Sequence, residues 1–453
     1  MIVRDLSEAS VLAGMQKHLN EVESQRTRDR HMMMSYYESM VSVMEDDMRE
    51  YFDSASLKQT PLITEGLTRK LVNARAVVYK QSPERECDER YFDYFDDLDS
   101  SMLQMERLTY LLGTNAMRVR FNQDEQKLEW LPISEFYPIF ESYNENPSGV
   151  IYPLFSYGSN AYSAKEDQMF AYWSDDQHYR INGKGQIVDS PDNPDRINPY
   201  GVMPILFAHR HFLSTDWFRE GCSEIVQMNK AVNVMLSEVN LALRLTTLGQ
   251  PTITNTDSIE NLKFGADKPI ILSSGELEFK TSGVDLQKVV EVIRFMVDSV
   301  AYNHNLKTKW SVGRESAISG ESLKMAEIDL TESLVTDANM IWRPFEKKRF
   351  NIDRAVIEYE TGVKLDDAYS VDFTERRFPL SAEEERQQWE WEWTHGLKSK
   401  KDYFRYMDKD NIEEDQIDET IARIDEEGTP TKPDQKQQAP AFSLQKAFGN
   451  GNT

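Results

Sequence analysis

Hydrophobic residues in the first part of the chain recur at helical spacing. Residues 10–51 repeat Leu, Met, Val and Tyr every three or four positions, which predicts helices in an N-terminal region covering residues 1–60. Two further helices are predicted over residues 62–79 and 89–112. The methionines within 10–51 are typical of adaptable core or interface packing rather than of a metal site.

In the middle of the chain the spacing between hydrophobic residues shortens to two positions. Residues 115–121 and 127–131 alternate apolar and polar side chains around a turn-forming segment, so they predict a β-hairpin. The other predicted strands cover residues 149–157, 168–173, 178–181 and 204–209. Helices before and after a mixed, mainly antiparallel sheet region indicate an α+β fold.

A continuous apolar stripe then predicts a long helix over residues 216–248, which Gly249 and Pro251 terminate. After a compact segment with Pro, Gly and short β-like runs, a second amphipathic helix is predicted over residues 284–305. Two helices that enclose a small module indicate a module carried on a two-helix stalk.

A third long helix is predicted over residues 321–360. Pro344 lies inside its apolar pattern, and proline removes a backbone hydrogen bond and clashes with the preceding turn, so we expect a kink or break near Trp342. A strand (369–373), an acidic helical region (381–427) and a Pro-, Gln-, Gly- and Asn-rich tail (428–453) follow. We expect the tail to be disordered, or ordered only against a partner.

The charge of the chain is strongly negative, with a formal net charge of -25. Affinity for DNA normally comes from Lys and Arg side chains that neutralise phosphates, so this charge opposes DNA binding overall. It is consistent with simple solubility and also with a conduit to which moving DNA does not adhere. Charge alone does not separate these two interpretations.

Cysteine content and hydropathy indicate a reducing cytoplasm. Cys87 and Cys222 are the only cysteines, too few for a disulfide framework and too isolated for a zinc site. No apolar run approaches the roughly 20 residues that a membrane helix needs. The N-terminal residues lack the apolar core of a signal peptide.

Motifs for catalysis are not found in the sequence. Gly183-Lys184-Gly185 lacks the upstream Gly and the following Ser or Thr of a phosphate-binding loop, so it is interpreted as a turn. His209 and His211 share a face of a predicted strand, but surface or interface histidines explain them better than a metal site does. We therefore expect no enzyme, no catalytic residue, no cofactor and no metal, with an unfamiliar enzyme as one alternative.

One stretch reverses the sign of the charge. Lys307, Lys309 and Arg314 surround Trp310 in a segment without acidic residues. An ordinary solvated loop explains them, and so does a loop that touches a polyanion through a few salt-sensitive contacts. The sequence favours neither interpretation.

The order of these elements, together with several sequence stretches, resembles the portal proteins of tailed double-stranded-DNA bacteriophages. The stretches that carry the resemblance are 115–137, 198–207, 225–237, Ile318-Ser-Gly-Glu-Ser-Leu-Lys324 and 369–399. Each motif is degenerate, and it is their common order and spacing that resembles the family. The resemblance spans nearly the whole chain, although the first 60 residues match less closely.

The resemblance implies a portal architecture. Its parts would be an N-terminal helical region (1–60), an α/β wing (61–215), a two-helix stem (216–250 and 284–306), a small α/β clip (251–283), a tunnel loop (307–320), a long kinked wing helix with a strand (321–375), a helical crown (376–427) and a flexible tail (428–453).

The resemblance also implies a function. Portals are rings of twelve subunits at one capsid vertex, through which the genome is packaged and ejected. The expected partners are further copies of the chain, double-stranded DNA, the terminase large subunit, the major capsid and scaffolding proteins and the head-to-tail adaptor, with no membrane. The expected location is the virion, after assembly in the host cytoplasm. Another structural virion protein, such as a head-to-tail adaptor or a capsid-associated protein, is the main alternative.

Two groups of residues would form the portal's contacts. The resemblance implies a DNA-facing tunnel loop with Lys307, Lys309, Trp310 and Arg314. It also implies a clip that docks the packaging motor or the adaptor, with Phe264, Lys268, Glu276 and Lys280.

Overall fold

The structure is a computed structural model of the 453-residue chain. It describes residues 2–3, 6–21, 23–52, 61–133, 135–141, 146–154, 169–191, 193–211, 216–248, 250–254, 276–280, 286–307, 328–373, 382–397, 399 and 421. The chain divides into two units, Met1–Arg377 and Phe378–Thr453, and each is described by itself. No helix within the described ranges is both long and apolar enough to cross a membrane.

The N-terminal part is helical, as the sequence predicts. Its helices are α1 (Glu8–Glu21), α2 (Glu23–Glu38), α3 (Val41–Met48) with the 3-10 turn η1 (Arg49–Tyr51), and α5 (Leu67–Arg75). The methionines of this region contribute to the core, since Met33, Met44 and Met48 are buried. This agrees with their interpretation as packing residues.

Two of the predicted helices are shorter than expected. Residues 62–79 form only α5, because the backbone leaves the helical region at Ala76 before the 3-10 turn η2 (Val78–Lys80). Residues 89–112 divide into the 3-10 helix η3 (Glu89–Tyr94) and α6 (Leu98–Leu112). The Asp97 carboxylate accepts a hydrogen bond from the backbone N–H of Ser100 and so starts α6 as a cap.

The strands form two main sheets, both largely antiparallel. The smaller has the order β10-β3-β4, and the larger has the order β1-β5-β6-β7-β8-β9, with only β1 and β5 parallel. The strands are β1 (Ile2–Val3), β3 (Thr114–Asn122), β4 (Lys127–Ile133), β5 (Tyr137–Glu141), β6 (Gly149–Leu154), β7 (Met169–Ser174), β8 (His178–Asn182), β9 (Ile187–Val188) and β10 (Ile205–His209). The predicted hairpin is confirmed as β3 and β4, whereas β1 and β5 have no clear alternation and were not predicted.

The long helix after this region contains the disturbance that Pro344 predicts. It consists of α10 (Ile328–Asp337), a π-helical turn (Ala338–Trp342) and α11 (Arg343–Thr361). The prediction near Trp342 is confirmed in the form of a π-helical turn, because Pro344 has no N–H to donate into a regular α-helical ladder. Beyond α11, the strand β13 (Ser370–Asp372) pairs with β2 (Glu84–Glu86).

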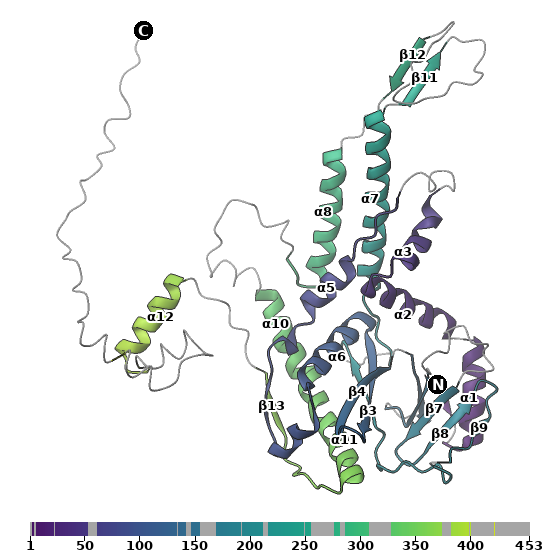
Figure 1. Cartoon of the computed structure of the whole chain (residues 1–453), viewed down its shortest axis with the longest axis vertical. Coiled ribbons are helices and arrows are strands. Elements are labelled where there is room, and N and C mark those ends of the chain that lie inside the picture. The colour runs from purple at the N-terminus through teal and green to yellow at the C-terminus, as the bar shows by residue number, and fades with distance from the viewer. Residues whose placement is uncertain are drawn as a thin grey trace, which may run out of the picture. The chain divides into compact units, whose positions relative to one another are not determined.

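The stalk is formed by α7 (Ser223–Leu248), β11 (Gln250–Thr254), β12 (Glu276–Lys280) and α8 (Leu286–Asn303). Figure 1 shows α7 and α8 side by side, with the β11–β12 hairpin beyond their far ends. The prediction that α7 starts at residue 216 is wrong. The backbone at Gly221 passes so close to α6 that an added Cβ would lie 2.3 Å from the Leu111 carbonyl oxygen, so the preceding segment is held against the body in a non-helical form.

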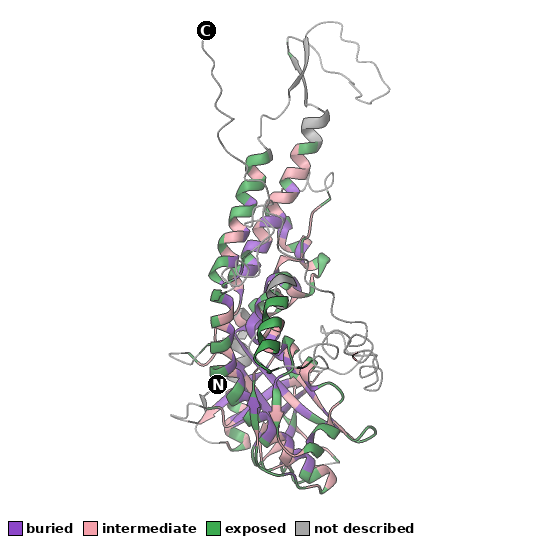
Figure 2. Cartoon of the chain, turned by 90° about the vertical axis from the view of Figure 1, so that its left-hand side faces the viewer, coloured by how far each residue is buried: buried purple, intermediate pink, exposed green. Residues whose placement is uncertain are grey.

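Two hydrophobic cores pack the helices and the three-stranded sheet, and buried residues gather in both (Figure 2). One core joins α2, α5, α6, α7, α8 and α10, and the other lies between the three-stranded sheet, α6 and α11. In the second unit the structure describes α12 (Ala382–Thr394), inside the predicted acidic helical region, while most of residues 398–453 lie outside the described ranges.

Candidate functional site

The stalk is the part of the first unit that projects from the sheets. The 26 residues of α7 give it a length of about 39 Å, at about 1.5 Å per residue. At its tip β11 and β12 pair antiparallel, with Gln250 opposite Lys280 and Thr254 opposite Glu276. The structure thus shows a small β-module carried on two helices.

The predicted contact residues lie at both ends of this stalk. Glu276 and Lys280 are at opposite ends of β12 at the tip, whereas Phe264 and Lys268 lie outside the described residues. Lys307 is exposed just after α8, at the foot of the stalk (Figure 1). Lys309, Trp310 and Arg314 also lie outside the described residues. The described members of the two groups are therefore not brought together.

A line of polar side chains on α7 holds the chain segment before α5. Asn229, Asn233 and Ser237 follow each other at intervals of four residues and are buried. Asn229 Oδ1 accepts the backbone N–H of Thr68 at 2.9 Å, Asn233 Oδ1 accepts that of Glu65 at 2.9 Å, and Ser237 Oγ accepts that of Ile63 at 2.9 Å. This ladder satisfies backbone groups that the irregular segment 61–66 and the first turn of α5 leave unpaired. Sequence analysis missed it, although the spacing of four was a visible signal.

The inner face of α8 packs into the helical core. Ile293, Val297 and Ala301 lie one turn apart and are buried in the same cluster as Val232 of α7. This is the stripe that the sequence predicts, and it fixes α8 against α7.

A second apolar face of α8 points away from the chain. The exposed fractions of Val292, Phe295 and Tyr302 are 52%, 73% and 69%. Figure 2 shows exposed residues recurring along the stalk helices. Spacings of three and seven place the three side chains on one face, a signal that the sequence contained and that sequence analysis overlooked. Isolated exposed hydrophobics are ordinary, but a stripe of large ones marks an interaction surface.

A buried polar cluster lies at the foot of the stalk. Its centre is His304, 2% exposed, just after the last residue of α8. The Nδ1 atom of His304 accepts from the Tyr110 hydroxyl, and Arg210 Nη2 lies 3.1 Å from the same atom. On the other side, Nε2 lies 2.7 Å from a carboxylate oxygen of Glu224 on α7. These partners place the imidazole proton on Nε2.

The electrostatics of this cluster keep His304 neutral. Burial lowers the pKa of His304 to about 4, and the positive charge of Arg210 acts in the same direction. The neighbouring Cys222 is buried, and burial raises the pKa of its thiol to about 11. The thiol donates to the backbone carbonyl of Tyr110 at 3.1 Å, so it is a protonated packing group rather than an activated nucleophile.

The cluster extends to the helix that follows the predicted tunnel loop. The Tyr110 ring lies between two guanidinium groups, with Arg210 at 4.2 Å and Arg75 at 5.2 Å from its centroid. Arg75 Nη2 in turn lies 2.7 Å from Asp337 Oδ2 at the end of α10. The polar cluster therefore ties α5, α6, α7, α8 and α10 together, on both sides of residues 308–327 in the sequence.

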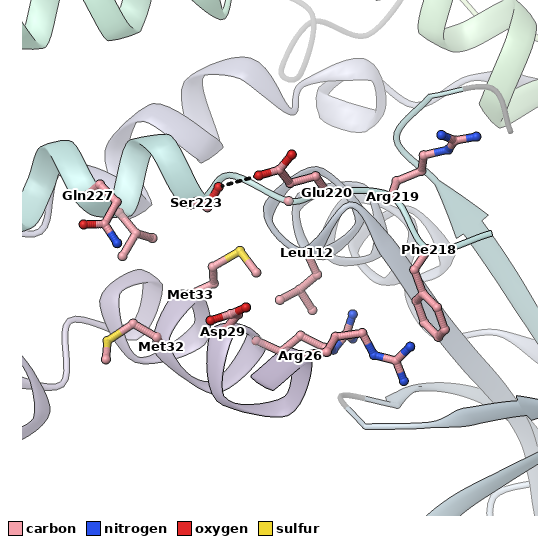
Figure 3. Close-up of a pocket in the computed structure, with 13 residues that line it drawn as sticks. Arg26, Asp29, Met32, Met33, Leu112, Phe218, Arg219, Glu220, Ser223 and Gln227 are labelled. Atoms are coloured by element: carbon pink, nitrogen blue, oxygen red, sulfur yellow. Dashed lines mark hydrogen bonds between the residues drawn. The ribbon is translucent and has the colours of Figure 1, made fainter. Parts of the chain in front are cut away.

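A pocket of about 180 Å³ lies between α2 and the start of α7 (Figure 3). The Arg26 guanidinium carbon is 3.5 Å from the centroid of the Phe218 ring, and Ser223 Oγ donates to Glu220 at 3.1 Å. Acidic Asp29 and Glu220 line the same pocket as the arginines. This mixed lining favours neither an anionic nor a cationic ligand.

The two histidines considered for a metal occupy different surroundings. His209 Nδ1 lies 3.0 Å from Thr114 Oγ1, and its ring packs edge-on against Trp217 with centroids 4.8 Å apart. Burial, with help from Arg219, lowers the pKa of His209 to about 4. In the described part of the chain, no group of three or more His, Cys, Asp or Glu side chains could hold a metal ion.

Comparisons with known proteins give only remote similarities. No family model and no curated protein matches the chain. Among solved structures, the chain is similar to one from the neck of an empty gene transfer agent particle computed with C6 symmetry, at 13% identity and a TM-score of 0.34, over 76% of this chain and 89% of that one. It is also similar to a chain from the virion of the native gene transfer agent particle, at 14% identity and a TM-score of 0.35, over 79% and 93%.

A third similar structure is the neck of the native gene transfer agent particle computed with C12 symmetry. There the identity is 12% and the TM-score 0.35, over 75% of this chain and 89% of that one. At these values the similarity does not by itself establish a function.

Proposed function

We propose that this chain is the subunit of a phage portal, a dodecameric ring at one capsid vertex through which DNA enters and leaves. The observation that carries the proposal is the stalk, in which α7 and α8 bear a β-hairpin at their far end and project from an α+β body (Figure 1). The stalk corresponds to the stem and the hairpin to the clip that the sequence resemblance implies. The sheet region then corresponds to the wing.

The surface of α8 supports an assembled state. Phe295 and Tyr302 are 73% and 69% exposed although they are large apolar or amphipathic side chains. Burying such a side chain stabilises an assembly by about 1.5–3 kcal/mol. A ring that surrounds each stalk with neighbouring stalks removes these side chains from water.

The distribution of charge supports a conduit for DNA. The chain has a net charge of -25, which opposes DNA binding overall and leaves any attraction to phosphates to local basic segments. Lys307, exposed at the foot of α8, begins the basic segment in which Lys309 and Arg314 follow. We propose that these residues, with Trp310, make the few exchangeable contacts with the passing duplex.

The tip of the stalk is the proposed docking site for the motor and the adaptor. It contains β12, with Glu276 and Lys280, beyond the far ends of α7 and α8 in the first unit (Figure 1). Together with Phe264 and Lys268 it is the clip. In this proposal the terminase large subunit binds there during packaging and the head-to-tail adaptor binds there afterwards, whereas capsid and scaffolding proteins contact the body.

Purified full-length protein tests the proposal directly. Negative-stain images are expected to show rings with a central hole, and mass measurement is expected to give twelve copies of the 52.7 kDa chain. The chain is not expected to hydrolyse ATP by itself. A monodisperse monomer, or a closed shell without a central hole, contradicts the portal assignment.

Replacement of the basic residues tests the conduit. The triple variant Lys307→Ala, Lys309→Ala, Arg314→Ala is expected to change packaged genome length or DNA retention and to leave ring assembly intact, because only phosphate contacts are lost. The matched control removes three exposed positive charges from α11, at Arg343, Lys347 and Lys348. Unchanged packaging and retention in the first variant contradict a DNA-facing loop.

A further inference from the structure

We infer that the outer face of α8 binds a second copy of this chain, and that it does so on the opposite side of that copy's stalk, at Met40, Val41 and Tyr51. This inference rests on the proposed function, for which it names the surfaces that close the ring. The exposed fractions of the three residues are 42%, 51% and 58%. Met40 and Val41 lie at the start of α3 and Tyr51 lies at the end of the turn that follows it, so these exposed side chains, termed the α3 patch, flank a helix whose other face is packed into the core.

The α3 patch is held rigidly on α7. Met44 and Met48 turn the inner face of α3 into the core with no exposure. Asp47 ties it down, since its carboxylate lies 2.6 Å from Lys230 Nζ of α7 and accepts the Tyr36 hydroxyl at 2.7 Å. Lys230 Nζ also lies 5.0 Å from the centroid of the Tyr51 ring. The patch is therefore already ordered before a partner binds, so binding there costs little conformational entropy.

The two patches face in different directions. Figure 1 shows α8 and α3 on opposite sides of α7, which contacts both of them. A contact between the α8 face of one copy and the α3 side of another is heterologous: it uses different surfaces on the two partners and leaves a free surface at each end. Such contacts generate rings when the rotation between copies closes. A self-complementary α8–α8 contact stops at a dimer.

The dimensions of the two patches match. From Val292 to Tyr302 and from Val41 to Tyr51 the chain advances ten residues, in helix or 3-10 helix. Ten residues of α-helix extend over about 15 Å. Exposed segments of similar length on two helices can pack along each other.

Charges at the edges of the patches are complementary. Lys288 is exposed one turn before Val292, at the end of the α8 face nearer the stalk tip. Asp46 and Glu50 are exposed on α3 and the turn that follows, with Arg49 between them 3.2 Å from Asp46, so the exposed charges on this side are net negative. Opposite charges at the edge of an apolar contact set its register and suppress pairing of the α3 side with itself.

Glutamate substitutions test the contact without disturbing the core. The double variants Phe295→Glu with Tyr302→Glu, and Val41→Glu with Tyr51→Glu, are each expected to shift the full-length protein from its assembled mass to monomer. The matched control is Ile197→Glu, at an apolar residue that is 59% exposed in the sheet region, and it should assemble as the wild type does. Circular dichroism should be unchanged in all of them, because every substituted side chain is exposed.

Cross-linking identifies the pair of surfaces. With Phe295→Cys and Val41→Cys in the same chain, a short bis-maleimide is expected to produce a ladder of covalent multimers, while each single variant gives none beyond wild type. Dimers from Phe295→Cys alone would overturn the inference in favour of an α8–α8 contact.

The failures of the two proposals can be told apart. Rings that persist in both glutamate variants, together with no cross-linked ladder from the double cysteine variant, overturn the α8–α3 contact and leave the portal assignment standing. A ladder from a protein that forms open filaments confirms the contact and contradicts the portal. A wild-type protein that stays monomeric at all concentrations contradicts both.

Discussion

In the first unit, the body (the sheets with α6 and α11) and the stalk (α7 and α8) differ in which side chains they bury. Around α11, even charged groups are enclosed, since Glu346, Arg349 and Asp353 have no exposure at all. On α8, in contrast, Phe295 remains 73% exposed although it is apolar. The charged groups around α11 find their partners within one chain, whereas α8 carries an apolar surface that a second molecule can cover. The difference indicates where the chain folds and where it assembles.

The charges in the body are stabilised by a closed set of partners. Glu346 interacts with Arg349, receives Arg85 Nη2 at 2.9 Å and accepts the Tyr369 hydroxyl at 2.7 Å. Asp353 accepts the Tyr91 hydroxyl at 2.6 Å and the Trp130 indole N–H at 2.9 Å. Burial by itself raises the pKa of Glu346, but the guanidinium groups of Arg349 and Arg85 outweigh it, so the pKa is below its ordinary value.

Removing the central cation should have the largest effect. Arg349→Met leaves two buried carboxylates with fewer positive charges, and breaking a buried ion pair in this way costs about 3–5 kcal/mol. We expect the free energy of unfolding in urea to fall by that amount. The matched control is Arg343→Met on the same helix, whose ion pair with Asp372 is exposed and contributes less than about 1 kcal/mol. Equal losses in the two variants would contradict the contrast between body and surface.

The two faces of α8 should respond differently to truncation. Ile293→Ala creates a cavity in the helical core and is expected to lower the free energy of unfolding of the monomer by about 2–4 kcal/mol. Phe295→Ala, two residues further along on the exposed face, is expected to change it by less than about 0.5 kcal/mol. Chemical unfolding at protein concentrations that dissociate the assembly measures both. A large loss from Phe295→Ala would mean that its ring is packed within the monomer.

The smallest expected effect is the pH dependence at the foot of the stalk. The pKa of His304 is about 4 in the folded chain and 6.5 when unperturbed, so the unfolded chain binds the proton first. Its contribution to stability is complete above pH 6.5 and is lost as the pH falls toward 4. Between pH 7 and pH 5 this loss is about 2 kcal/mol. His304→Gln should remove this part of the pH dependence of the free energy of unfolding.

The body supplies a control of opposite sign. Burial raises the pKa of Asp353 to about 6 from 3.8, so the folded chain binds this proton first. Its contribution to stability is present at low pH and is lost as the pH rises through 6. Asp353→Asn should therefore make stability fall more steeply on acidification, whereas His304→Gln makes it fall less. The same slope in both variants would contradict the two assignments.

Much of the fold could be predicted from local patterns. The β3–β4 hairpin, the stalk helices and the disturbance before Pro344 were all predicted, because alternation, helical spacing and proline chemistry act over a few neighbouring residues. The predicted ends of the helices and strands were less accurate. The start of α7 at Ser223 depends on the close approach of Gly221 to α6, a contact between distant parts of the sequence.

The candidate site was predicted only in outline. The stalk and its module are visible in the sequence, and Lys307 lies at the foot of the stalk as an exposed residue. The exposed face of α8 and the polar cluster around His304 were missed. Phe295 and Tyr302 look like ordinary apolar positions of an amphipathic helix, and nothing in the sequence shows which of two apolar faces the neighbouring helix covers.

The sequence by itself determined the order of elements, the strongly acidic charge and the resemblance to portals, because these depend on residue types and their spacing. Tertiary structure alone decided which groups meet. Tyr110, Arg210 and His304 come from three separate parts of the chain and form one buried cluster, and Arg85 reaches Glu346 in the same way. Burial and hydrogen-bond partners are properties of the packed chain. Packing therefore also decided that one apolar face of α8 is exposed, where we infer that a second copy binds.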